Sequence, residues 1–114
     1  MIKVINIKDN NPTVDYALCM LETELKNAQI EGVQVLVVIH GYGSHGTGGQ
    51  IKRSTRQLLR KLKRQNKIAT YVGGEEWSNR NDDVALITKI CPSVILSKDI
   101  GNLNPGVTVV LLNK

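Results

Sequence analysis

The stretch VLVVIHGYGSHGTGGQIKR, residues 35–53, brings together three kinds of sequence that decide the fold. The run from Val33 to Ile39 is rich in β-branched residues and is typical of a strand covered on both faces. Five glycines follow between residues 41 and 49, and a basic segment comes directly after them. A strand that leads through a glycine loop into a helix gathers free backbone N–H groups at the positive end of the helix dipole. This order of elements therefore predicts an anion-binding site.

The sequence on either side of this stretch alternates between strand and helix patterns. Thr13 is a suitable N-cap for an amphipathic helix, and apolar residues recur after it at spacings of three and four. The segment DDVALITKI, which ends before Pro92, fits a short helix. The predicted elements are strands at 3–7, 33–39, 68–72 and 107–112 and main helices at 14–29 and 50–65. Such alternation favours a sheet with parallel pairs and helices packed on it.

Length and composition predict one globular unit over residues 1–114. A chain of 114 residues with 41% apolar content can fill one core but not two. Apolar runs fall short of the roughly 20 residues that cross a membrane, and MIKVINIKDNN lacks the apolar centre of a signal peptide. We therefore expect a cytoplasmic protein without a membrane partner. Cys19 and Cys91 are expected to be structural thiols, because their spacing matches no metal site.

Charge is distributed unevenly along the chain. No acidic residue occurs between Gly32 and Gly74, whereas residues 52–67 hold eight of the fifteen basic side chains. The rest of the chain has seven basic and ten acidic residues, so the excess of positive charge is local. Like charges without acidic neighbours three or four residues away destabilise a helix unless an anion compensates them. A polyphosphate backbone would do so, which indicates DNA or RNA as the partner.

Two common nucleotide-binding motifs do not fit the glycine loop. Residues 41–46 satisfy GxGxxG, but the first acidic residue after the loop is Glu75, too distant to bind a ribose. In a Walker A loop, Lys and Ser or Thr would stand where Gly49 and Gln50 are. We expect no cofactor. A small-molecule phosphate or nucleotide site stays open as a third alternative, although few aromatic residues are present to hold a base.

His40 and His45 flank the start of the loop. His40 ends a strand, where a histidine either orders the loop through a backbone hydrogen bond or takes part in chemistry. His45 lies within the glycine segment, and neither residue has a carboxylate or cysteine near it in sequence. This pattern is a poor match for a metal site, so none is predicted.

Two segments resemble a known family. VVIHGYGSHGTGGQIKRSTRQLL resembles the HGxGxG signature of Smr (small MutS-related) domains, and NPGVTVVLL is similar to the final strand of that family. The resemblance implies a two-layer α/β sandwich with a four-stranded mixed sheet and two main helices, like the C-terminal domain of a bacterial translation initiation factor. Residues 73–104 would form an irregular insertion before the last strand. Members of the family bind DNA or RNA, and several are nicking or RNA-cleaving endonucleases.

The resemblance also implies a set of site residues. His40, Gly41, Gly43 and Ser44 match the signature, and the basic start of the second helix follows it. The predicted nucleic-acid-binding residues are Gly41, Gly43, Ser44, His45, Gly46, Gly48, Gly49, Lys52, Arg53, Arg56 and Arg60.

One departure from the family pattern bears on catalysis. Many Smr domains carry LDLHG at the end of the first strand, whereas here Asn6 and Lys8 stand where its Asp and His would be, and Asp9 is offset. We therefore expect a protein that binds DNA or structured RNA without cutting it efficiently. The alternative is a weak endonuclease, with His40 as general acid or base and a carboxylate from Asp9 or from the insertion.

The insertion itself gives two smaller expectations. Its acidic pairs, Glu75-Glu76 and Asp82-Asp83, are predicted to be solvated loop charges. Trp77 is predicted to hold the insertion against the body of the domain, with stacking on a base as the alternative.

Overall fold

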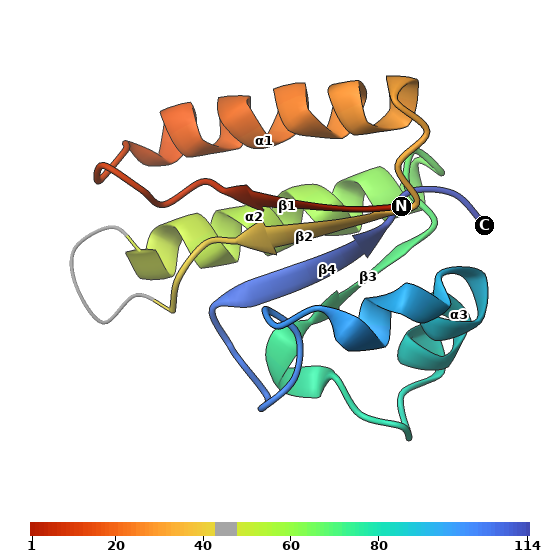
Figure 1. Ribbon diagram of the computed structural model, residues 1–114. Helices are drawn as coiled ribbons and strands as arrows, with labels where there is room; N and C mark the ends of the chain where they lie inside the picture. The colour runs from red at the N-terminus through yellow and green to blue at the C-terminus, as the bar shows by residue number, and fades with distance from the viewer. Residues whose placement is uncertain (43–47) are drawn as a thin grey trace.

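The computed structural model describes residues 1–42 and 48–114 and contains a four-stranded mixed sheet (Figure 1). The strands lie in the order β1 (Ile2–Asn6), β2 (Val35–Ile39), β4 (Val107–Leu111) and β3 (Thr70–Gly73). β1 and β2 are parallel, and β4 runs antiparallel to both β2 and β3. The predicted mixed sheet is thus confirmed, with its one parallel pair joined through a helix, as parallel neighbours require.

Two long helices cover one face of the sheet. α1 (Val14–Ile30) begins at Thr13, whose hydroxyl accepts a hydrogen bond from Tyr16 N–H at 3.1 Å and confirms the predicted N-cap. α2 (Gly48–Arg64) follows the glycine loop. The buried side chains of this face come from both helices and from β1, β2 and β4, and include Leu21, Leu25, Leu36, Val38, Ile51, Leu59 and Val110. The two main helices predicted from the amphipathic spacing therefore both pack on the same face of the sheet.

The other face of the sheet is covered by the segment between β3 and β4. α3 (Asp82–Ile90) and the 3-10 turn Pro92–Leu96 pack Val84, Ile87 and Val94 against the sheet. Trp77 packs against this second core, as predicted. Residues 73–104 are accordingly less irregular than expected. The physical reason is that β2 and β4 carry valines on both faces, and the second face also has to be removed from water.

The observed elements agree closely with those predicted from periodicity. The main helices differ from the prediction by one or two residues at their ends, and β2 begins two residues later than expected. Within the described part of the chain, no helix has both the length and the apolarity that a bilayer crossing requires.

Candidate nucleic-acid interface

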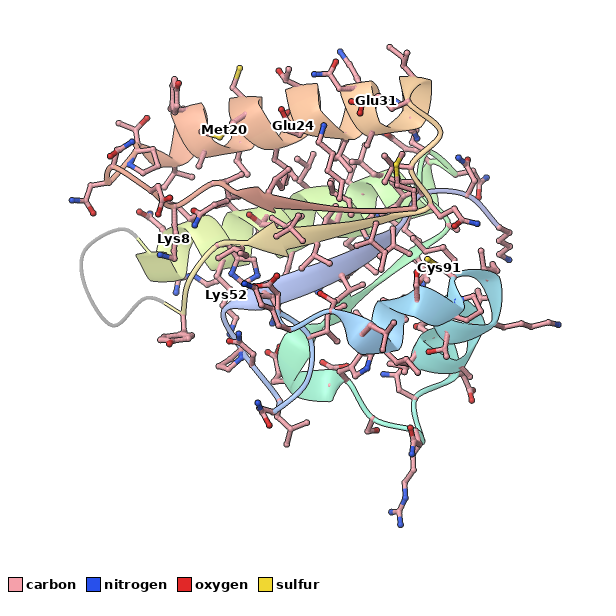
Figure 2. The ribbon with its side chains drawn as sticks, in the orientation of Figure 1. Lys8, Met20, Glu24, Glu31, Lys52 and Cys91 are labelled. Carbon is pink, nitrogen blue, oxygen red and sulfur yellow. The ribbon has the colours of Figure 1, made fainter. Side chains whose placement is uncertain are left out.

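Several of the predicted site residues that the structure describes lie at one edge of the sheet. Asn6, Ile39 and Val107 lie in register there, so β1 and β2 end where β4 begins. The turn after β1, the start of the glycine loop and the first turn of α2 share this end of the molecule (Figure 1). Figure 2 shows Lys8 and Lys52 at this end, and a Cβ on Gly41 would lie 3.0 Å from Cδ of Lys8.

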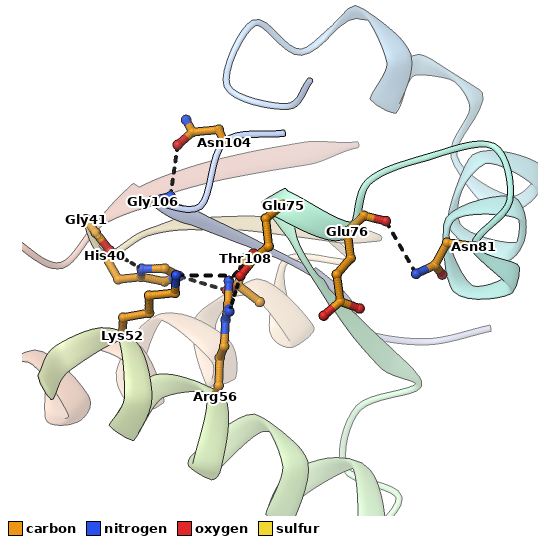
Figure 3. Close-up of polar contacts among 10 residues, drawn as sticks. All are labelled: His40, Gly41, Lys52, Arg56, Glu75, Glu76, Asn81, Asn104, Gly106 and Thr108. Carbon is orange, nitrogen blue, oxygen red and sulfur yellow. Dashed lines mark hydrogen bonds and ion pairs between the residues drawn. The ribbon is translucent and has the colours of Figure 1, made fainter. Parts of the chain in front are cut away.

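His40 is fully buried at this edge, and both of its ring nitrogens are hydrogen-bonded. Its Nδ1 lies 2.7 Å from the carbonyl oxygen of Gly41, and its Nε2 lies 2.8 Å from Oγ1 of Thr108 (Figure 3). Because a carbonyl oxygen only accepts, we assign the proton to Nδ1, and Nε2 then accepts the hydroxyl proton of Thr108. The imidazole thus ties the beginning of the loop to β4.

The surroundings keep this imidazole neutral. Burial is the main cause that lowers the pKa of His40 to about 4, and the positive charges of Arg56 and Lys52 lower it further. At neutral pH the ring therefore has no proton on Nε2, and its lone pair there is occupied by Thr108.

Arg56 connects the histidine to an acidic side chain from the insertion. Its Nε donates to Oγ1 of Thr108 at 3.2 Å, and its two terminal nitrogens donate to the two carboxylate oxygens of Glu75, each at 2.6 Å (Figure 3). Nζ of Lys52 lies 3.5 Å from the same carboxylate. The hydrogen bonds from Arg56 are the main cause that lowers the pKa of Glu75 to about 2. The result is a linked set of five side chains, His40, Thr108, Arg56, Glu75 and Lys52.

Two glycines make room for this arrangement. A Cβ on Gly73 would come within 2.5 Å of Oε1 of Glu75 and 2.7 Å of a terminal nitrogen of Arg56. A Cβ on Gly74 would collide with the backbone carbonyl oxygen of Asn104. The Gly73-Gly74 pair therefore lets the chain turn at the end of β3 so that the Glu75 carboxylate reaches Arg56.

Asp9 and the turn after β1 are placed differently. Oδ1 of Asn6 accepts hydrogen bonds from the backbone N–H groups of Lys8 and Asp9, at 2.9 and 3.1 Å, and so fixes the turn. The side chain of Asp9 is 66% exposed and lies 3.8 Å from Nζ of Lys8. Asp9 is thus paired with its neighbour, while the ring nitrogens of His40 are bonded to Gly41 and Thr108.

The predicted glycine loop is only partly within the described residues. Gly41 has a φ of +75°, a left-handed conformation that glycine adopts without strain. Gly43, Ser44, His45 and Gly46 lie outside the described residues. Gly48 and Gly49 belong to the first turn of α2.

The basic residues of α2 fall into two groups. Lys52 and Arg56 are partly buried and paired with Glu75. Exposed cations extend along the rest of the helix, and among the described residues none of them has a carboxylate within ion-pair distance: Arg53, Arg60, Lys61, Lys63 and Arg64. Two of the predicted binding residues, Arg53 and Arg60, thus belong to this group of five exposed cations, which we call the α2 face.

The structure corrects one sequence-based expectation. Glu75 was expected to be a solvated loop charge. That expectation is wrong, because Glu75 reaches Lys52 and Arg56 in the first turns of α2 from the end of β3 and pairs with both. Glu76, in contrast, is exposed as predicted.

Thr108 and Glu75 were missed as site residues, although the sequence holds a signal for each. Thr108 is the one polar residue in the final strand VTVVLL, where an apolar residue would suffice for the core. Glu75 is the first acidic residue after the long stretch that begins at Gly32, and it follows a glycine pair. Within the described residues, no three His, Cys, Asp or Glu side chains form a group that could hold a metal ion.

Comparison with known proteins agrees with this geometry. Residues 11–80 match the family described as the Smr domain. Among solved structures, the chain is similar to the Smr domain of Thermus thermophilus MutS2, with a TM-score of 0.61 and 21% identity over 98% of this chain and 99% of that one. A search of curated proteins finds no match. Since the family match covers more than half of the sequence and the fold is shared, the chain belongs to the Smr domain family.

Proposed function

We propose that this protein binds DNA or structured RNA through the phosphates, with the strand lying along the α2 face and reaching the start of the glycine loop. Smr domains are a family associated with nucleic-acid binding and with endonucleases. The observation that carries the proposal is the α2 face itself, five exposed cations of which none has a carboxylate within ion-pair distance among the described residues. Their mutual repulsion destabilises the helix, and a line of phosphates relieves it while releasing counterions.

Lys52 and Arg56 would form the innermost phosphate contact. Arg56 already holds the planar carboxylate of Glu75 through two parallel hydrogen bonds, and a guanidinium binds two phosphate oxygens with the same geometry. Glu75 therefore occupies the place that a phosphate would take. A nucleic acid that reaches this point has to compete with the carboxylate.

The same geometry supports binding without efficient cleavage. A general base must come within hydrogen-bond distance of the proton that it removes. His40 is fully buried, its Nε2 accepts from Thr108, and its low pKa makes it a weak base. His40 thus serves as a structural link between the loop and β4.

The test is a titration of labelled duplex DNA, single-stranded DNA and structured RNA with the pure protein over a series of salt concentrations. The triple variant Arg53→Ala/Arg60→Ala/Arg64→Ala removes three charges from the α2 face. The matched control, Arg80→Ala/Lys89→Ala/Lys114→Ala, removes three exposed charges that lie outside α2.

We expect the α2 variant to bind much more weakly, with a slope of log K against log salt that is smaller by about 2 to 3. The control should retain the wild-type slope, and a denaturing gel should show intact substrate. Equal losses in the two variants would mean that only net charge matters, and specific cleavage that depends on His40 would show an enzyme.

A further inference from the structure

Tyr42 presents an aromatic ring to solvent directly beside the start of the glycine loop. Tyr42 is 61% exposed although it follows the buried His40 and the half-buried Gly41. The ring lies against Gly106, where an added Cβ would come 2.9 and 3.0 Å from its Cδ1 and Cε1 atoms. One side of the ring therefore rests on backbone, and this close approach requires a glycine at position 106.

The backbone that supports the ring is well anchored. The carbonyl oxygen of Gly106 accepts hydrogen bonds from the N–H groups of His40 and Gly41, at 3.0 and 3.1 Å. The N–H of Gly106 donates to Oδ1 of Asn104 at 2.9 Å (Figure 3). The backbone of Gly106, on which the ring of Tyr42 packs, is thus hydrogen-bonded to the start of the loop and to the segment before β4.

A shallow pocket of about 390 Å³ opens next to the ring. Its lining comes from Tyr42 and from the end of the insertion, namely Lys98, Gly101, Asn102, Asn104 and Pro105. Because Oδ1 of Asn104 is used by Gly106, its amide nitrogen is the group available for a ligand. Gly101 and Asn102 have positive φ angles, so the backbone turns tightly where it lines the pocket.

The chemistry of this pocket matches one unpaired nucleotide. It combines an exposed aromatic face, the amides of two asparagines and the ammonium group of Lys98. A nucleobase can stack on the ring and bond its edge to the amides, while the adjoining phosphate meets the lysine. The faces of a paired base are covered by its neighbours in the duplex, so only a base outside the stack fits.

We propose that this pocket holds a single unpaired base stacked on Tyr42. This inference rests on the proposed function, because the strand that supplies the base is the one that runs along the α2 face. It assigns a ligand-binding role to the end of the insertion, residues 98–105, in addition to covering the sheet.

The experiment compares three ligands that share one duplex: a blunt end, a short single-stranded overhang, and the same overhang with abasic sites. We expect the wild type to bind the overhang about tenfold more tightly than its abasic form, since stacking on an aromatic ring contributes roughly this much. The measured quantity is the dissociation constant of the abasic ligand divided by that of the overhang ligand. Because both ligands contain the same duplex, a change in affinity for the duplex does not alter this ratio.

Two substitutions at Tyr42 and one control sharpen the comparison. Tyr42→Phe should keep the ratio, because stacking needs only the ring, whereas Tyr42→Leu should reduce it to about one. Tyr16→Leu is the matched control, because Tyr16 is 64% exposed on α1, away from the pocket. A ratio near one in the wild type, or an unchanged ratio in Tyr42→Leu, would overturn the inference while leaving the proposed function intact. Failure of the wild type to bind any of the three ligands would overturn both.

Discussion

At the scale of single residues, the buried state of His40 makes a prediction about pH. The unfolded chain binds a proton on this imidazole near the ordinary pKa of 6.5, but the folded protein does not bind it until pH reaches about 4. Since the unfolded state binds more protons in that window, lowering the pH through it favours unfolding. The free energy of unfolding should fall by up to about 1.4 kcal/mol for each pH unit there.

Thermal unfolding of the wild type and of His40→Gln between about pH 7 and pH 5 measures this effect. We expect the wild type to lose stability as the pH falls from about 7 to 5. The stability of the variant should change little, because its glutamine at position 40 does not titrate. The pKa of His40 can also be measured directly, without a substitution at position 40. An NMR titration of the His45→Ala variant should show one imidazole that stays neutral well below pH 6, and a midpoint near 6.5 would contradict the account.

Glu75 makes a second prediction at this scale. If its carboxylate competes with phosphate for Lys52 and Arg56, Glu75→Gln should bind nucleic acid several-fold more tightly, with a salt slope about 1 to 2 units steeper. The glutamine oxygen still accepts one of the two hydrogen bonds from Arg56, and the volume of the side chain is unchanged. Glu76→Gln is the matched control, because it removes the same charge from an exposed neighbour. Weaker binding of the Glu75 variant than of this control would mean that Glu75 positions Arg56 for the ligand.

At the scale of elements, the sequence is sufficient for most of the fold. The spacing of apolar residues in α1 and α2 and the cap at Thr13 are local signals, and the structure confirms them. The site is less predictable because its key contacts join distant elements. Glu75 meets Arg56, nineteen positions earlier, only because β3 and α2 pack together, and Thr108 meets His40 only because β4 pairs with β2. No periodicity within one element encodes such pairs.

Thr70 in β3 gives a prediction at the element scale. Its side chain is 2% exposed, and its hydroxyl has no hydrogen-bond partner among the described residues. Because a buried hydroxyl without a partner costs free energy, the nearly isosteric Thr70→Val should raise the free energy of unfolding by about 1 kcal/mol. Urea denaturation of the two proteins measures the change, and a loss of stability would show that the hydroxyl does bind a partner.

At the scale of the whole molecule, the helix that carries the positive charge and the insertion pack on opposite faces of the sheet. The α2 face carries the excess of positive charge on the side of α1 and α2, while α3 and the rest of the insertion cover the opposite side. A charge distribution of this kind orients a polyanion before contact. β2 ends at the end of the molecule where α2 begins (Figure 1), and Tyr42, which lines the pocket, follows three residues after β2, so one strand that binds along α2 could reach the pocket.

The most direct test of this account is to map the bound strand onto the protein by amide NMR. The isotope-labelled protein would be titrated with a short oligonucleotide that carries a single-stranded overhang. We predict that the shifted signals lie along residues 52–64 of α2 and at Gly41 and Tyr42, while the outer surface of α1 and the helix α3 stay unchanged. Shifts concentrated on α1 or α3, with α2 unaffected, would contradict the central claim that the nucleic acid binds along the α2 face.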